Sequence, residues 1–142
     1  MIRATRRLAA AGITAALLAS PFAAQASIAQ DTSGPLQGTE WHLVSMGTVA
    51  VDGHEPLLRL ASDGTLGGST GCNAMRGGYN AEGTSLEFGP IGTTRKYCRA
   101  GWETEQAFLS MIEDVRGYEI TDGKLILVGG NGETLAEFRA GN

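Results

Sequence analysis

Two cysteines and two histidines are the side chains of this sequence best suited to redox chemistry, metal binding or nucleophilic catalysis. A redox pair usually has closer spacing than Cys72 and Cys98, as in Cys-x-x-Cys. A metal site would need more ligands, and His42 and His54 show no ligand spacing to either cysteine. In an exported chain two cysteines most simply pair with each other, here closing a loop of about 27 residues worth roughly 3–4 kcal/mol. The sequence therefore favours a structural disulfide, with a redox pair or free thiols as alternatives, and predicts no metal and no cofactor.

Catalytic motifs are missing from the sequence. It has no Gly-x-Ser-x-Gly elbow, no His-Glu-x-x-His and no nucleotide fingerprint. The glycines of residues 67–71 lack a following Gly-Lys-Ser/Thr, so a strongly coiled strand explains them better than a phosphate loop. Glu103 and Glu105 are two residues apart and would not share a helix face as an acid/base pair. We predict no enzyme and no catalytic residue. The alternative is a small periplasmic hydrolase or inhibitor-type protein with a loop-built site, which would need His42 or His54 in a concave pocket beside a carboxylate or hydroxyl.

Positive charge is concentrated around the two cysteines. Arg76 lies shortly after the first cysteine, and Arg95, Lys96 and Arg99 flank the second. A disulfide would bring these cations together. They would form either an anion- or partner-binding patch or a solvated rim balanced by nearby acids.

The first 26 residues have the features of a cleaved secretory signal peptide. Three arginines precede an apolar run over residues 8–19, which is too short to span a bilayer comfortably. Residues 24–26 fit a small-x-small cleavage site that leaves Ser27 as the first mature residue. Arg6 and Arg7 also admit twin-arginine export, although their flanking residues favour the general secretory route. We expect a periplasmic or secreted protein with no membrane span after cleavage.

The mature chain is acidic and long enough for one domain. Removing the three signal-peptide arginines from 11 Lys+Arg leaves 8 against 15 Asp+Glu, a net charge of −7. Such a chain is a poor candidate for binding nucleic acid or an anionic membrane. We assign residues 27–35 to a flexible leader and residues 36–140 to a single domain, which we expect to be monomeric.

Short segments of alternating polarity, separated by turn residues, predict a mainly β domain. Trp41, Leu43 and Ser45 alternate with His42 and Val44, a period-2 pattern that suits a strand. Asp-Gly turns are expected at residues 52–53, 63–64 and 122–123. The expected strands or extended pieces cover residues 41–45, 48–51, 57–61, 65–69, 77–79, 85–88, 91–97, 118–121, 124–128 and 134–139.

One segment, residues 102–115, has the spacing of an amphipathic helix. Its apolar residues recur at i, i+3, i+4 and i+7, namely Phe108, Met111, Ile112 and Val115. Glu103 and Glu105 lie in the first turn, where carboxylates favour the positive end of a helix. Gly117 is a candidate for the C-terminal cap.

These segments together resemble the META domain family, which includes the heat-shock protein HslJ. The resemblance covers residues 36–139, and its most specific part is the sequence Gly-Cys-Asn at residues 71–73 followed by Gly-Gly-Tyr at residues 77–79. The family usually has Met-Ala before the second cysteine, where this sequence has Lys96 and Tyr97. The other matching positions are residues 38–43, residues 93–98, Glu105, Phe108, Tyr118, Leu125 and Phe138.

The resemblance implies two roughly orthogonal antiparallel sheets that form an incomplete barrel closed by the helix at about 102–115. It looks like the fold of type III secretion pilotins, which bind lipid or a secretin tail in an internal groove. The family also implies a role in envelope stress, including antibiotic tolerance, without established catalysis. We therefore predict a non-enzymatic periplasmic envelope-stress protein that binds a protein segment or an apolar ligand.

Overall fold

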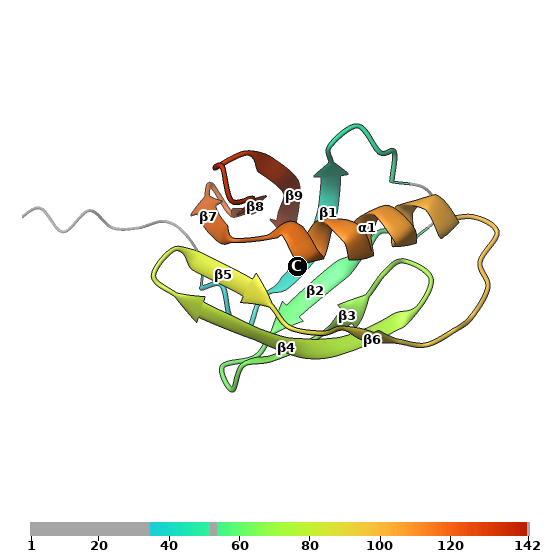
Figure 1. Ribbon diagram of the computed structural model, residues 1–142, viewed down its shortest axis with the longest axis horizontal. Helices are drawn as coiled ribbons and strands as arrows, with labels where there is room; N and C mark the ends of the chain where they lie inside the picture. The colour runs from blue at the N-terminus through green and yellow to red at the C-terminus, as the bar shows by residue number, and fades with distance from the viewer. Residues whose placement is uncertain (1–34, 52–53, 142) are drawn as a thin grey trace, which may run out of the picture.

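The computed structural model describes residues 35–51 and 54–141. The predicted signal peptide, the leader up to residue 34 and the turn at residues 52–53 lie outside this range. The described chain is mainly β with a single helix, which confirms this part of the predicted fold (Figure 1). In chain order the elements are β1 (Glu40–Met46), β2 (Leu57–Leu60), β3 (Thr65–Ser69), β4 (Ala74–Glu82), β5 (Ser85–Phe88), β6 (Gly92–Thr93), α1 (Trp102–Asp114), β7 (Gly117–Thr121), β8 (Lys124–Val128) and β9 (Thr134–Ala140).

The strands form one antiparallel sheet in the order β3-β2-β1-β9-β8-β7-β5-β4-β6. β3 also pairs with β4, which joins distant members of this order into a ring of strands. The ring is weakest between β5 and β7, which share the single pair Ser85↔Gly117. The family resemblance implied two orthogonal sheets, whereas the pairings connect all the described strands into one sheet.

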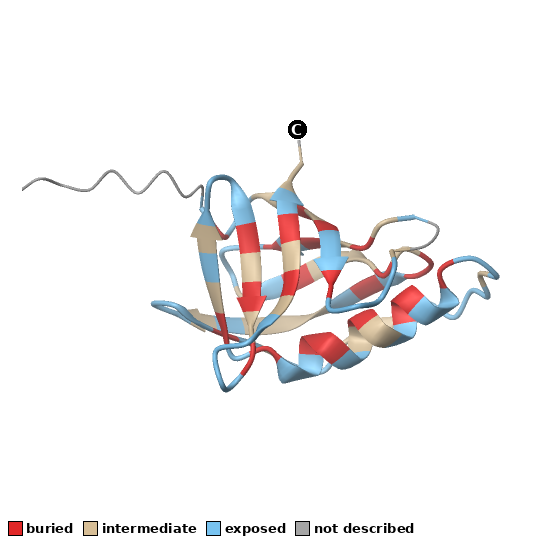
Figure 2. Ribbon diagram, turned by 90° about the horizontal axis from the view of Figure 1, so that it is seen from above, coloured by how far each residue is buried: buried red, intermediate tan, exposed pale blue. Residues whose placement is uncertain are grey.

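Helix α1 follows β6 and contributes to the hydrophobic core. Phe108, Met111 and Ile112 are buried on it, as the spacing indicated, and so is Val115, which directly follows the helix. The ring of Phe108 meets that of Phe138 on β9 edge-on, with centroids 6.4 Å apart. Figure 2 shows α1 running alongside the strands, with buried residues in both. The helix and the sheet therefore share one core.

The first strand departs from strict alternation. Its register against β9 shifts between Leu43 and Ser45. Because an extra residue in a strand turns the following side chains to the other face, Ser45 is exposed and Met46 is buried. The period-2 alternation expected over Trp41, Leu43 and Ser45 therefore stops after Leu43.

Three further predictions are corrected by backbone geometry. Residues 48–51 do not form a strand, because the chain turns back after Met46 and makes only an isolated bridge to Val49. Only Gly92–Thr93 of the extended piece 91–97 pairs as a strand, since the chain then leaves β4. Gly117 does not cap the helix but begins β7, because Val115 is already extended and ends α1.

Candidate binding surface around the disulfide

A tight turn between β3 and β4 begins the site. Gly71 has a φ of +92°, and a Cβ there would lie 2.2 Å from the backbone oxygen of His54. Glycine is thus required both by the left-handed backbone and by the close passage of a neighbouring segment. The hydroxyl of Thr70 accepts a hydrogen bond from the amide of Asn73 at 2.9 Å and closes the turn. The turn places Cys72 and Asn73 side by side, facing the chain that follows β6.

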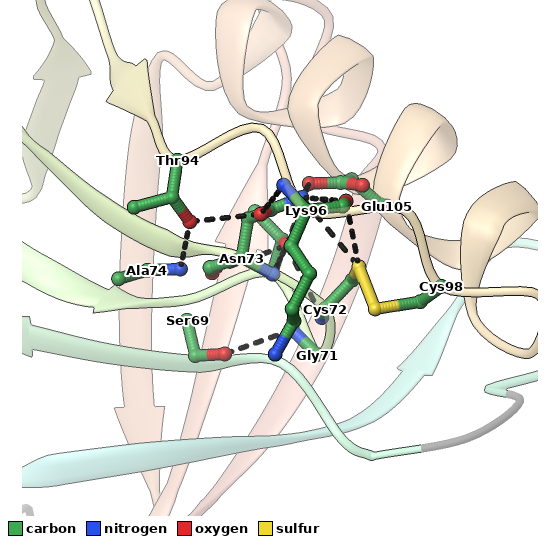
Figure 3. The surroundings of a disulfide bond; sticks show 10 residues. Ser69, Gly71, Cys72, Asn73, Ala74, Thr94, Lys96, Cys98 and Glu105 are labelled. Atoms are coloured by element: carbon green, nitrogen blue, oxygen red, sulfur yellow. Dashed lines mark hydrogen bonds between the residues drawn. A yellow bond between two sulfur atoms is a disulfide. The ribbon is translucent and has the colours of Figure 1, made fainter.

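The predicted disulfide is confirmed. Cys72 and Cys98 are bonded, with their Cα atoms 5.8 Å apart. The bond ties the turn to residues 94–101, which we call the Cys98 loop and which leads into α1. Figure 3 shows the sulfur atoms between the turn and this loop. A covalent tie thus holds the loop where no strand pairing does.

Asn73 fixes the same loop through its side-chain amide. Its Oδ1 accepts hydrogen bonds from the Lys96 amide at 2.7 Å and the Thr94 hydroxyl at 2.8 Å (Figure 3). Its Nδ2 donates to the Lys96 carbonyl at 3.1 Å. The amide of one buried side chain therefore satisfies both backbone groups of Lys96, as a neighbouring strand would.

Glu105 completes this network from the first turn of α1. It is only 4% exposed, and its Oε1 accepts hydrogen bonds from Asn73 Nδ2 and from the Thr70 hydroxyl, both at 2.9 Å. Sequence reasoning gave this carboxylate only a helix-end role and missed its burial. A signal was present, because Glu105 precedes Phe108 by three residues and Ile112 by seven and so shares the buried face.

Two aromatic side chains are exposed beside the network. Tyr97, on the Cys98 loop, is 78% exposed, and Trp102, which begins α1, is 52% exposed. Both line a groove of about 260 Å³ near Thr94 and Gln106, and both line a second groove of about 750 Å³ near Val49. The aromatic pair therefore stands between two hollows of the surface.

The structure divides the predicted basic patch. Arg95 and Lys96 line the smaller groove and Arg99 the larger one, whereas Arg76 on β4 lines a different groove over β2 and β3. Among the described residues none of these four cations takes part in an ion pair. We call the set Arg95, Lys96, Tyr97, Arg99 and Trp102 the aromatic-cation surface.

The two histidines differ in surroundings. His54 is exposed. His42 lies between two carboxylates, with Nε2 2.7 Å from Glu40 and Nδ1 2.8 Å from Glu55. Both ring nitrogens are engaged, so neither faces a hydroxyl nucleophile. A loop-built hydrolase would need a histidine in a concave pocket beside a carboxylate or hydroxyl. His42 has the carboxylates beside it.

The carboxylates beside His42 are also bonded to arginines. The hydrogen bond from Arg59 lowers the pKa of Glu40 against the opposing effect of burial, and His42 lowers it further. Partial burial acts to raise the pKa of Glu55, but hydrogen bonds from His42 and Arg139 outweigh it and lower that pKa. This chain of charges is a stabilising contact between strands and holds both carboxylates ionised.

The comparisons with known proteins decide the family. A scan against protein families matches the META domain over residues 34–142. The chain belongs to the META domain family. No curated protein matches this META domain chain. Within the part that the structure describes, no helix is long and apolar enough to cross a membrane, and no cluster of three His, Cys, Asp or Glu side chains could hold a metal ion.

Two NMR structures share the fold. An NMR structure of a protein from Burkholderia xenovorans is 28% identical, with a TM-score of 0.62, and the match covers 75% of this chain and 84% of that one. A second NMR structure is 22% identical with a TM-score of 0.56, covering 72% and 89% of the two chains. A DUF4847 family protein from Bacteroides vulgatus is 17% identical with a TM-score of 0.48, covering 59% and 57%.

Proposed function

We propose that this META domain protein is a non-enzymatic binding protein that works outside the cytoplasm and holds an acidic segment of a partner protein on the aromatic-cation surface. The observation that carries the proposal is the exposure of Tyr97, 78%, on a loop held by a disulfide and by Asn73. Tyrosine, tryptophan and arginine dominate the binding energy of protein interfaces. A loop ordered before binding loses less entropy when the complex forms.

Charge favours an acidic partner segment. Arg95, Lys96 and Arg99 surround the aromatic pair and have no ion-pair partner within the described residues. The protein as a whole is acidic, so these cations form a local exception to its charge. Complementary charges would speed association and orient the partner more than they would add affinity.

The disulfide supports a location outside the cytoplasm, because such bonds persist in oxidising compartments. A periplasmic or secreted protein with a cleaved signal peptide fits this bond. The family resemblance adds an envelope-stress role, including antibiotic tolerance. Deleting the gene and measuring envelope-stress responses would test that role, and unchanged responses would count against it.

Two other candidates fit the site less well. An apolar ligand needs an enclosed apolar hollow, whereas the grooves beside Tyr97 and Trp102 are rimmed by cations. A hydrolase needs a histidine nitrogen free to take a proton from its nucleophile, and both nitrogens of His42 are held by carboxylates.

The test is capture from envelope extract by the wild-type protein and by the double variant Tyr97→Ala/Trp102→Ala. We expect the double variant to lose a partner that wild type retains, and high salt to weaken its capture by wild type. Val44→Ala is the matched control, because Val44 is an exposed apolar residue of β1 that lines neither of the two grooves beside Tyr97 and Trp102. Identical captured proteins for wild type and double variant would refute the proposal.

A further inference from the structure

A row of facing residues crosses five strands on the outer side of the sheet. Register places Glu40 on β1 opposite Arg59 on β2, and Arg59 opposite Gly67 on β3. It continues with Gly67 opposite Arg76 on β4, and Arg76 opposite Gly92 on β6. Directly paired residues point to the same face. Since neighbouring strands are about 4.8 Å apart, the two arginines stand about 10 Å apart with a glycine between them.

Nothing in the fold requires glycine at position 67. Its φ lies outside the left-handed region, and a Cβ built there would have no atom within 4 Å. The next residue behaves differently, because Gly68 has a φ of +154° and its Cβ would lie 2.1 Å from the Leu57 oxygen. Glycine weakens a strand relative to alanine. A glycine that neither the backbone angles nor the packing requires can mark a place where another molecule approaches the backbone closely.

The surface over Gly67 is hollow. A groove of about 740 Å³ lies there, and its lining includes Arg59, Gly67, Arg76 and the buried Leu66. This volume is in the range of small-molecule sites. Figure 1 shows β2, β3 and β4, the strands that carry these residues, side by side.

The charges of the groove favour an anion. Arg59 donates to Glu40, with Nε 2.7 Å from Oε2. Glu40 also lies in the groove, but Arg59 and His42 already hold its two oxygens. Arg76 is exposed and has no ion-pair partner among the described residues. Its guanidinium is therefore available for a bidentate pair with a carboxylate or phosphate.

We infer that the β2–β4 groove binds a small organic anion, whose carboxylate or phosphate pairs with Arg76 and whose flat body lies over Gly67, with Arg59 as the second wall. This site lies over β2, β3 and β4, whereas the aromatic-cation surface lies on the Cys98 loop and the start of α1. The inference is therefore independent of the proposed partner binding. The ligand is recognised by one oxyanion and by one flat group that a side chain at position 67 would displace.

The test titrates three probes with the same ring into the purified, ¹⁵N-labelled protein. Benzoate carries a carboxylate, phenyl phosphate carries a phosphate, and benzamide is the uncharged control. We expect saturable NMR shifts of the Gly67 amide and its neighbours with at least one anion and none with benzamide. The tighter of the two anions identifies the oxyanion. Absence of saturation with both anions, or equal shifts with benzamide, would overturn the inference.

Two variants separate the groove from general charge. Arg76→Gln should weaken binding of the better anion about tenfold or more, because it removes a charge-assisted pair. Lys124→Gln removes one positive charge from β8, outside this groove and outside the aromatic-cation surface, and should leave the affinity unchanged. Gly67→Val keeps both arginines but fills the hollow, so it should abolish binding. The NMR spectrum of this variant should remain that of a folded protein. Wild-type affinity in Gly67→Val, or equal losses in Arg76→Gln and Lys124→Gln, would refute the site.

Discussion

At the scale of single residues, Asn73 and Glu105 explain why a polar network lies under an irregular loop. Asn73 replaces a missing strand by bonding both backbone groups of Lys96. Glu105 then accepts from Asn73 and from Thr70, so these buried donors are satisfied. A buried polar network of this kind is stable only while each member keeps its partners.

The first prediction concerns the Glu105 carboxylate. Glu105→Ala should lower the free energy of unfolding by about 1–3 kcal/mol, because the Asn73 amide and the Thr70 hydroxyl lose their shared acceptor and keep only the longer bonds to Cys72, Lys96 and the Asn73 carbonyl. Urea denaturation measures this loss. Glu105→Gln keeps an acceptor of the same shape and should be less destabilising. Equal losses in the two variants would show that the hydrogen bonds are not what holds this position.

A second residue-scale prediction compares adjacent glycines of β3. Gly67→Ala should be neutral or stabilising by up to about 1 kcal/mol, because alanine suits a strand better and the added Cβ meets nothing. Gly68→Ala should destabilise strongly, because its Cβ would collide with the Leu57 oxygen. Thermal unfolding of both variants gives the comparison, and a similar melting temperature for the two would contradict it.

At the scale of elements, regular segments were predictable and irregular ones were not. Helix α1 was predictable from the spacing of Phe108, Met111 and Ile112, because the buried apolar residues of a helix recur with its period of 3.6 residues. The bulge in β1 was not predictable, since Ser45 and Met46 fit either register until β9 is placed beside them. Register in a sheet depends on the partner strand, which one segment alone does not specify.

The candidate site was predictable in part for the same reason. The Cys72–Cys98 bond followed from the count of cysteines and was correct. The association of Arg76 with the other three cations rested on closeness in sequence to a cysteine. The strand β4 carries Arg76 beyond the turn to another groove, and only the pairing of β4 with β3 and β6 reveals this.

The element-scale prediction concerns the Cys98 loop. Replacing both cysteines, Cys72→Ser/Cys98→Ser, should lower the free energy of unfolding by roughly 3–4 kcal/mol, as expected for a closed loop of this length. The loop should loosen before the sheet does, because beyond the backbone bond from Thr94 to Ala74 it is held to the turn by side chains. Hydrogen exchange should be faster at the Lys96 amide than in wild type and similar in β8. Unchanged exchange at Lys96 would mean that Asn73 alone fixes the loop.

At the scale of the whole molecule, charged contacts join separate strands. Glu40 bonds Arg59 on β2, and His42 bridges to Glu55, which in turn contacts Arg139 on β9 at 2.6 Å. Individually, exposed pairs of this kind contribute little. As a chain they tie β1 to both of its neighbours in the sheet.

The whole-molecule prediction concerns acid stability. The pKa values of Glu40 and Glu55 are lowered from 4.5 in the folded protein, so the folded state binds their protons less readily than the unfolded chain does. Their stabilising contribution is therefore present above pH 4.5 and is lost as the pH falls through the lowered values. Denaturation measured from pH 6 to pH 3 should show stability falling with acid.

The control for this prediction replaces the titrating groups. Glu40→Gln/Glu55→Gln should flatten the pH dependence of stability in that range, whereas Glu82→Gln, at an exposed position without an ion pair, should leave it as in wild type. A double variant that loses stability with acid as steeply as wild type would assign acid unfolding to other groups.

The pairing of β1 with β9 sets the order in which the molecule can be completed. The first strand of the described chain lies against the last one, with Trp41 opposite Ala140. A chain that emerges with its N-terminus first, from a ribosome or through a narrow pore, cannot give β1 this neighbour until Thr134–Ala140 has appeared. Contacts between such distant segments form late and slow folding. Fragments cut short before residue 134 should therefore remain unable to close the molecule, however long they are given.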